Sequence, residues 1–164
     1  SVIGLKQGCY LLSPNQHKLE EIRQKISPRF SFEPVENDLN LSLVQLELGD
    51  SRKLAEQASC NQKIAAHGCF SLGMLFPFTS VESKAHDYRS LYWQAGLLGQ
   101  ALYFGAESVG LQGTGIGCFH DNQIHEYLGH ETAEFQDLYH FVVGKALVDD
   151  RLTNLPAYDK QRNR

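Results

Sequence analysis

The chain has 164 residues, a formal net charge of −4 and a pI near 5.9. Hydrophobic residues make up 42% and aromatic residues 10%, which is typical of one folded globular domain. The acidic balance gives no electrostatic footprint for nucleic acid or for a membrane surface, and no apolar run approaches the ~18 residues of a membrane span. Because no signal-peptide pattern opens the chain and the four cysteines form no C-x-x-C motif, we expect a cytoplasmic protein with free thiols.

The first third of the chain predicts short elements separated by turns. Residues 2–12 carry short apolar runs around two glycines and indicate a hairpin or two edge segments. Residues 17–25 form a short polar stretch with two apolar residues on one side. Residues 41–48 alternate apolar and polar side chains, which fits a strand or the lead-in to a helix, and the pattern leaves both open.

Two stronger elements follow. A cap signal at Gly49–Ser51 precedes residues 52–66, which we expect to form one helix ending at Gly68. Residues 69–78 are a continuous apolar run of strand length and predict a central strand closed by a proline.

Residues 85–108 predict one long helix, and the rest of the chain is arranged around it. One face recurs at three- and four-residue steps. Its members are Tyr88, Leu91, Tyr92, Ala95, Leu98, Gly99, Leu102 and Ala106. The small residues Ala95, Gly96 and Gly99 suit a close contact with another helix, while ordinary packing within the chain explains them equally well.

Glycines dominate the segment after the long helix. Gly110 ends the helix, and Gly113, Gly115 and Gly117 follow at alternate positions. Glycines allow a ligand to approach bare backbone N–H groups, although a simple turn is the plainer interpretation. The pattern follows a helix and is not G-x-G-x-x-G, so it fails the context test for a dinucleotide fingerprint.

The last part of the chain predicts a short strand at 116–119, a small helix at 122–128 and a buried strand at 138–143. Residues 145–164 are charged and indicate an arm packed against another surface. Helices and strands that alternate in this order predict an α+β or mixed α/β layer fold.

Five stretches taken together resemble the nitroreductase family of FMN-dependent enzymes, and most closely its SagB-type dehydrogenase branch. The stretches lie in the order and spacing of that branch and cover nearly all of the chain. They are Gly4-Leu5 to Tyr10 with His17-x-Leu19; Gln62 to Ala65; Tyr88-Arg89 with Ala95-Gly96, Gln100 and Gly110-Leu111; Gly115-Ile116-Gly117-x-Phe119; and Val143-Gly144 with Asp150-Arg151-Leu152 and Pro156-Ala157-Tyr158.

The resemblance implies an α+β fold with a nitroreductase-like mixed sheet flanked by helices and a long central helix. It makes residues 1–164 one nitroreductase-like domain that lacks the family's Arg-rich N-terminal segment, which binds the FMN phosphate. It also implies a homodimer with FMN at the interface.

The resemblance further implies a cofactor site. The backbone N–H groups of Gly117 and Cys118 would donate to flavin N5 and O4, with Gly115 and Ile116 packed on the ring. Lys145 and Arg151 are the candidates for the phosphate end, with solvated surface charge as the alternative. Lys84 matches a lysine that the branch uses in azoline oxidation and is the catalytic candidate, but Ala85 stands where the branch has tyrosine.

The implied function is hydride transfer between flavin N5 and a small organic or peptide-derived substrate, with NAD(P)H as a candidate electron donor. The alternative is a non-catalytic half of the fold that completes or stabilises a partner subunit.

The histidines and Cys118 raise two further possibilities, a metal site and a thiol nucleophile. His120, His125 and His130 are five positions apart, which wraps them around a helix, so no metal site is expected. Cys118 and His120 would share a face in an extended strand, which leaves a thiol nucleophile as an alternative to a small buried cysteine.

Overall fold

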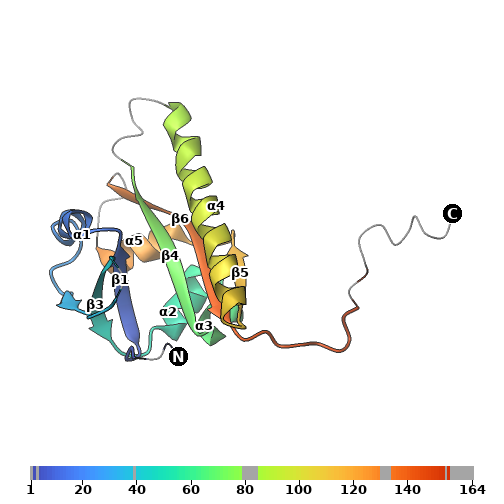
Figure 1. Ribbon diagram of the computed structural model, residues 1–164. Coiled ribbons are helices and arrows are strands. Elements are labelled where there is room, and N and C mark those ends of the chain that lie inside the picture. Colours follow the sequence, from blue (N-terminus) through green and yellow to red (C-terminus); the bar gives the residue numbers. More distant parts are fainter. Residues whose placement is uncertain are drawn as a thin grey trace.

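The computed structural model describes residues 2, 4–38, 40–78, 85–129, 134–153 and 155. Its strands form two three-stranded sheets, ordered β1-β3-β2 and β4-β6-β5 (Figure 1). The α+β class and the long central helix are as expected. The expected mixed sheet takes the form of two sheets, and every strand pair in the described residues is antiparallel.

The first sheet is built from β1 (Gly8–Ser13), β2 (Glu33–Pro34) and β3 (Ser42–Leu48). The strand interpretation of residues 41–48 is therefore correct, and its alternation buries Val44 and Leu46. The hairpin predicted over residues 2–12 does not form, because β1 pairs with β3 instead of with its own neighbours.

Two helices cover this sheet. α1 (Gln16–Arg23) is capped by Asn15, whose side chain accepts a hydrogen bond from the Lys18 N–H at 2.9 Å. α5 (Asp121–Leu128) ends at Gly129, whose left-handed φ of 70° is typical of a glycine that ends a helix. The buried side chains between them are Leu11, Leu19, Ile26, Phe30, Val44, Leu46 and Leu128.

The single helix predicted over residues 52–66 is two helices, α2 (Arg52–Ala58) and α3 (Lys63–His67). The break lies at Cys60 and Asn61, whose φ angles of 54° and 57° are left-handed. An α-helix cannot continue through left-handed residues, so the chain turns between Ser59 and Gln62.

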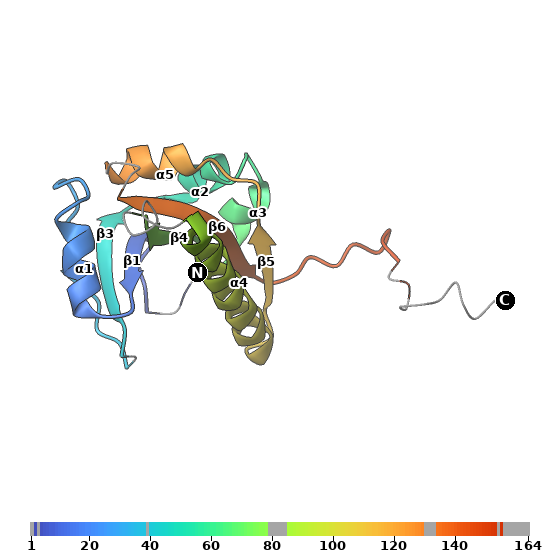
Figure 2. The same cartoon turned by 90° about the horizontal axis from the view of Figure 1, so that it is seen from above.

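The second sheet has β6 (Phe135–Gly144) between β4 (Phe70–Pro77) and β5 (Gln112–Ile116). Seen from above, α4 lies on one side of β6, and α2, α3 and α5 lie on the other (Figure 2). Such double coverage explains the near-continuous apolar run of β6. The strand expected at 116–119 lies earlier, so two of the alternating glycines are within β5.

α4 (Ala85–Ser108) has the bounds that the sequence predicts. Leu91, Ala95 and Ala106 are buried against the sheet, and a Cβ on Gly99 would approach the Tyr139 ring to 2.7 Å. The buried face of α4 is narrower than the sequence predicts, because Tyr88, Tyr92 and Leu98 are exposed. Within the described residues, no helix is long and apolar enough to cross a membrane.

The chain leaves the second sheet at Gly144 and continues as an arm. Residues 145–153 form no helix or strand and extend away from the rest of the molecule (Figure 1). Apolar side chains on the arm, Leu147 and Val148, are almost fully exposed.

Candidate functional site

β5 is the edge strand of the second sheet, and its glycines lie against aromatic rings. A Cβ on Gly113 would approach the Phe141 ring to 2.7 Å. A Cβ on Gly115 would overlap the Tyr139 hydroxyl. The Gly115 N–H donates to Tyr103 Oη at 2.9 Å. Both glycines are therefore explained by aromatic side chains from α4 and β6 that fill the space beside β5.

The tyrosine against Gly115 stays neutral. Burial, with a smaller contribution from Tyr103, raises the pKa of Tyr139 above its ordinary value. At neutral pH the Tyr139 hydroxyl is thus a protonated, uncharged group at the inner face of β5.

Gly117 and Cys118 differ from the glycines before them. Both are exposed, and a Cβ on Gly117 would meet nothing within 4 Å. In the described part of the chain, no acceptor is hydrogen-bonded to the backbone N–H of Gly117 or of Cys118. These two N–H groups are donors available to a ligand at the end of an edge strand, which fits the expected contact with the polar edge of a flavin ring.

Ile116, which was expected to pack on the flavin ring, lies in the core. Its side chain is buried with Ala65 and Val142 on the α3 side of the sheet. As a whole residue Ile116 is 2% exposed, so it offers little surface to a ligand.

The two cations expected at the phosphate end do not gather beside Gly117 within one chain. Lys145 follows Gly144, which pairs with Gln112 at the opposite end of β5, and five residue steps along a strand span about 17 Å. Arg151 lies on the arm, where its guanidinium bonds both Asp149 carboxylate oxygens at 2.8 and 2.7 Å. This ion pair holds the pKa of Asp149 below its ordinary value. Lys84 lies outside the described residues.

A buried polar cluster lies on the other face of β6. Ser59 Oγ shares a 3.0 Å hydrogen bond with His140 Nδ1, and His140 Nε2 lies 2.5 Å from Asp137 Oδ2. All three residues are 3% exposed or less, and the Phe119 ring stacks on the imidazole. An irregularity in the β4–β6 pairing at Gly73/Leu75 places Asp137 and His140, three residues apart, on one face. The cluster ties α2 to the sheet and is shielded from solvent.

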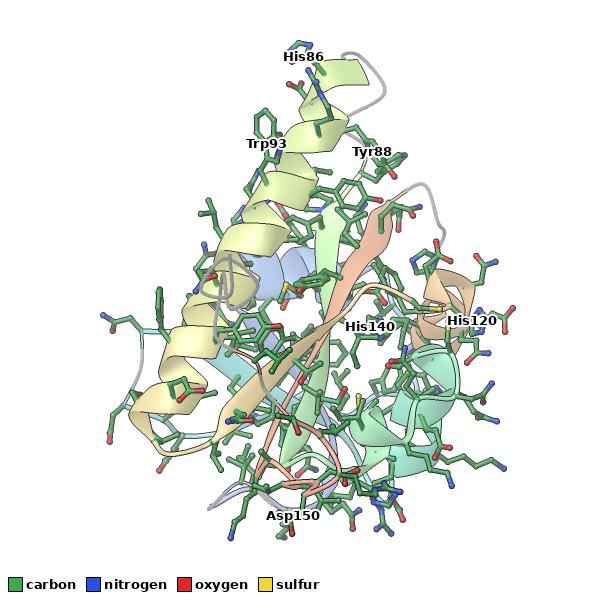
Figure 3. All side chains as sticks on the ribbon, turned by 90° about the vertical axis from the view of Figure 1, so that its right-hand side faces the viewer. His86, Tyr88, Trp93, His120, His140 and Asp150 are labelled. Carbon is green, nitrogen blue, oxygen red and sulfur yellow. The ribbon has the colours of Figure 1, made fainter. Side chains whose placement is uncertain are left out.

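Two of the evenly spaced histidines differ in burial. His120 is exposed just before α5 (Figure 3), and His125 is buried within that helix. Among the described residues, no three His, Cys, Asp or Glu side chains are grouped to hold a metal ion. His130 lies outside the described residues.

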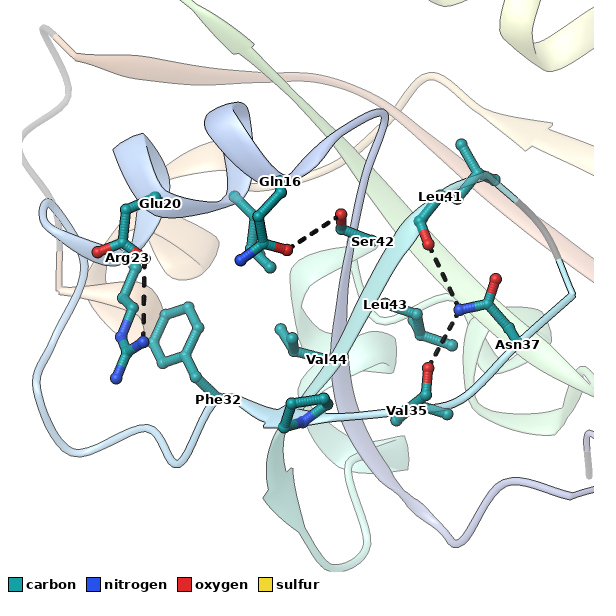
Figure 4. Close-up of a pocket in the computed structure, with 12 residues that line it drawn as sticks. Gln16, Glu20, Arg23, Phe32, Val35, Asn37, Leu41, Ser42, Leu43 and Val44 are labelled. Carbon is teal, nitrogen blue, oxygen red and sulfur yellow. Dashed lines mark hydrogen bonds and ion pairs between the residues drawn. The ribbon is translucent and has the colours of Figure 1, made fainter.

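A cavity of about 280 Å³ opens in the first sheet, between α1 and β3 (Figure 4). Phe32, Leu43 and Val44 supply apolar walls, and Arg23 lies at its margin with its guanidinium 3.9 Å from Glu20. Arg23 and Glu20 therefore place one charge of each sign at the margin of this cavity.

Comparisons with known proteins add to this geometry. No protein-family model matches the chain, and no curated protein matches it. Among solved structures, a candidate nitroreductase from Anabaena variabilis superposes with a TM-score of 0.64 and 24% identity, over 90% of this chain and 26% of that chain. The chain has a nitroreductase-like fold. It spans about a quarter of the length of that solved protein.

A second solved structure, a candidate NAD(P)H:FMN oxidoreductase from Staphylococcus epidermidis, has a TM-score of 0.44 and 15% identity, over 94% of this chain and 90% of that chain. A TM-score of 0.44 carries no argument about this chain.

Sequence reasoning missed the contacts that cross between elements. The Tyr103 and Tyr139 hydroxyls at Gly115 come from α4 and β6, and no spacing in the chain links them. The Ser59–His140–Asp137 cluster joins residues up to 81 positions apart. A polar pair spaced by three in an apolar strand, Asp137 and His140, was the available signal for the cluster.

Proposed function

We propose that the protein is an FMN-dependent oxidoreductase that transfers hydride between flavin N5 and a small organic or peptide-derived substrate. The observation that carries the proposal is the exposed Gly117–Cys118 backbone at the end of β5, in a chain with a nitroreductase-like fold. When bound, FMN would supply the redox chemistry, and this chain would supply orientation and electrostatics.

Gly117 and Cys118 have the character that the ring edge requires. Two fixed backbone N–H donors stabilise negative charge without reorganising, which is the largest protein contribution in many active sites. The absence of a side chain at Gly117 lets a planar ring approach the backbone closely. In this proposal Gly115 and Ile116 hold the Gly117–Cys118 segment in place beneath the ring, because the protein already fills the space around them.

A homodimer is the second part of the proposal. The outward face of α4 exposes Trp93 (67%), Leu97 (71%) and Phe104 (69%), and these residues recur at steps of four and seven on one side of the helix. Apolar side chains of this size, unburied along one stripe, favour a contact with a second copy. The apolar arm after β6 adds a further surface for the same partner.

The dimer also bears on the phosphate end of the site. Lys145 and Arg151 do not gather beside Gly117 within one chain. We propose that the two cations reach the phosphate from the arm once that arm packs in the dimer, with Arg151 exchanging Asp149 for the phosphate.

The finer assignments follow the SagB-type branch. Lys84 is the proposed catalytic residue near the substrate, and NAD(P)H is a candidate donor of electrons in place of the organic substrate. A cytoplasmic location suits four free cysteines. Residues 1–164 are proposed as one domain of this kind.

A second candidate function is favoured by one observation. The cations of the phosphate end do not converge in the described residues of one chain. A chain that supplies only the ring edge of a flavin site would be a non-catalytic half that completes or stabilises a partner subunit.

The test compares two glycine variants by titration with FMN, followed by quenching of flavin fluorescence. Gly117→Val has free space for its side chain, so the fold tolerates it, while the valine blocks the ring edge. We expect at least about a tenfold weaker Kd. Gly105→Ala, on an open part of α4, is the matched control and should bind as the unmodified protein does. Equal affinity in Gly117→Val would contradict the assigned ring edge.

A further inference from the structure

The loop after α2 and the segment after β5 are fastened to each other. The His120 N–H donates to the Ala58 carbonyl at 2.7 Å, and Gln62 Nε2 donates to the Cys118 carbonyl at 3.1 Å. The two bonds flank a pair of cysteines, Cys60 in the loop and Cys118 in the segment. Chain positions nearly sixty residues apart are thus held side by side from both directions.

The two hydrogen bonds bring the Cys60 and Cys118 thiols close together. Cys60 turns toward the segment after β5 at a left-handed φ of 54°. The neighbouring Cys118 thiol, and then burial, raise the pKa of the Cys60 thiol above its ordinary value. The arrangement pairs an exposed cysteine, Cys118, with a half-buried one, Cys60.

The other two cysteines have different surroundings. Cys9 lies in β1, and burial raises the pKa of its thiol. Cys69 lies just before β4. The contact between Cys60 and Cys118 therefore singles out one of the possible pairings.

We propose that Cys60 and Cys118 form a reversible disulfide, a thiol redox switch with a hydroperoxide as the oxidant. The exposed Cys118, as its thiolate, attacks the peroxide; a sulfur–oxygen bond forms, the O–O bond breaks, and a protonated leaving oxygen departs as water. Cys60 then attacks the resulting sulfenic acid of Cys118. A sulfur–sulfur bond forms, the sulfur–oxygen bond breaks, and a second water leaves. Two thiols lose two electrons and hydrogen peroxide gains them.

The disulfide would lock a segment that the reduced protein holds by hydrogen bonds and by the stacking of Phe119 on His140. It joins residues 117–120 covalently to the turn between α2 and α3. A low-molecular-weight thiol reverses it by exchange. Nothing in this step involves a flavin, so the inference stands whether or not the proposed function does.

The experiment treats the reduced, folded protein with a small excess of hydrogen peroxide, blocks remaining thiols by alkylation and maps tryptic peptides by mass spectrometry. Trypsin separates all four cysteines, because Lys53 and Lys63 bound the Cys60 peptide and Arg89 and Lys145 bound the Cys118 peptide. We expect a cross-linked 54–63/90–145 pair that has lost two hydrogen atoms and that disappears on adding dithiothreitol.

Variants separate the switch from random oxidation. Cys60→Ser should lose the cross-link and leave Cys118 as a sulfenic acid that dimedone traps. Cys69→Ser, the matched control, should form the cross-link as the unmodified protein does. Circular dichroism checks that each variant is folded. A protein whose Cys118 oxidises to sulfinic acid without a cross-link, or whose cross-links are spread over all cysteine pairs, would overturn the proposal.

Discussion

Gly115 is the residue where three elements meet. Its N–H donates to Tyr103 on α4, and its missing side chain leaves room for the Tyr139 hydroxyl on β6. The sequence indicated glycines suited to a close approach at this segment. It could not indicate that the approaching group at Gly115 is a tyrosine of the same chain, because that contact depends on how α4 lies against the sheet.

The first prediction concerns this contact. Gly115→Ala should destabilise the fold by about 1–3 kcal/mol, because the new methyl group overlaps the Tyr139 hydroxyl. Urea unfolding measures the loss, and the control Gly96→Ala, whose Cβ meets nothing within 4 Å, should cost nothing. Gly115→Ala combined with Tyr139→Phe should recover part of the loss. Equal stability of both single variants would show that the packing at Gly115 is wrong.

The second prediction concerns the buried Ser59. Ser59→Ala removes the partner of His140 Nδ1 inside the protein, and an unsatisfied buried group costs about 1–3 kcal/mol. Ser108→Ala removes an exposed hydrogen bond at the end of α4 and is the matched control, with a change near zero. Thermal or urea unfolding that ranks the two variants the other way would contradict the cluster.

The elements show which sequence signals were reliable. The bounds of α4 follow from a period of 3.6 sustained over six turns, and β4 and β6 follow from apolar runs that two layers bury. The errors lie where one or two backbone angles decide. Left-handed Cys60 and Asn61 divide the helix predicted over 52–66, and residue type alone does not announce them.

The third prediction concerns the packing of α5 on β1 and β3. Burial, and then the neighbouring Cys9 and the hydrogen bond to Glu47, raise the pKa of Tyr127 above its ordinary value of about 10. Because the folded pKa is raised, this stability is present below about pH 10 and is lost as the pH rises toward the folded pKa. Cys9, whose pKa is also raised, adds to the same alkaline loss.

Urea unfolding between about pH 8 and pH 11 measures the effect. The unmodified protein should lose stability steeply above about pH 10, and Tyr127→Phe should show a shallower fall. Tyr10→Phe, which removes an exposed hydroxyl bonded to the Lys6 carbonyl, is the control and should keep the steep fall. Parallel curves for all three proteins would exclude Tyr127 as a source of the pH dependence.

The fourth prediction concerns the outer face of α4. Leu97→Glu places a charge in the middle of the proposed dimer contact, where Leu97 is 71% exposed in one chain. The proposed homodimer should dissociate, and sedimentation or light scattering should give the mass of one chain. Gln24→Glu adds the same charge at an exposed position after α1, away from α4, and should leave the dimer intact. Unmodified protein that is already a monomer at high concentration would contradict the dimer.

At the scale of the molecule, the sequence predicted the fold class, the long helix and the family whose fold the structure shares. It could not predict that the strands divide into two sheets, because strand partners are set by contacts far apart in the chain. The site residues stay a prediction. Gly117 and Cys118 are exposed at the end of β5, and Lys145 and Arg151 are not brought to them within one chain.

Visible absorption decides whether this chain binds FMN, as its proposed redox function requires. The purified protein is mixed with FMN, desalted, and examined by visible absorption beside a flavin standard. We expect the protein to retain a flavin band that approaches one flavin per chain, and we expect Gly117→Val to lose it. A folded protein that retains no flavin would contradict the claim that this chain alone is a flavin enzyme, and would favour the non-catalytic half.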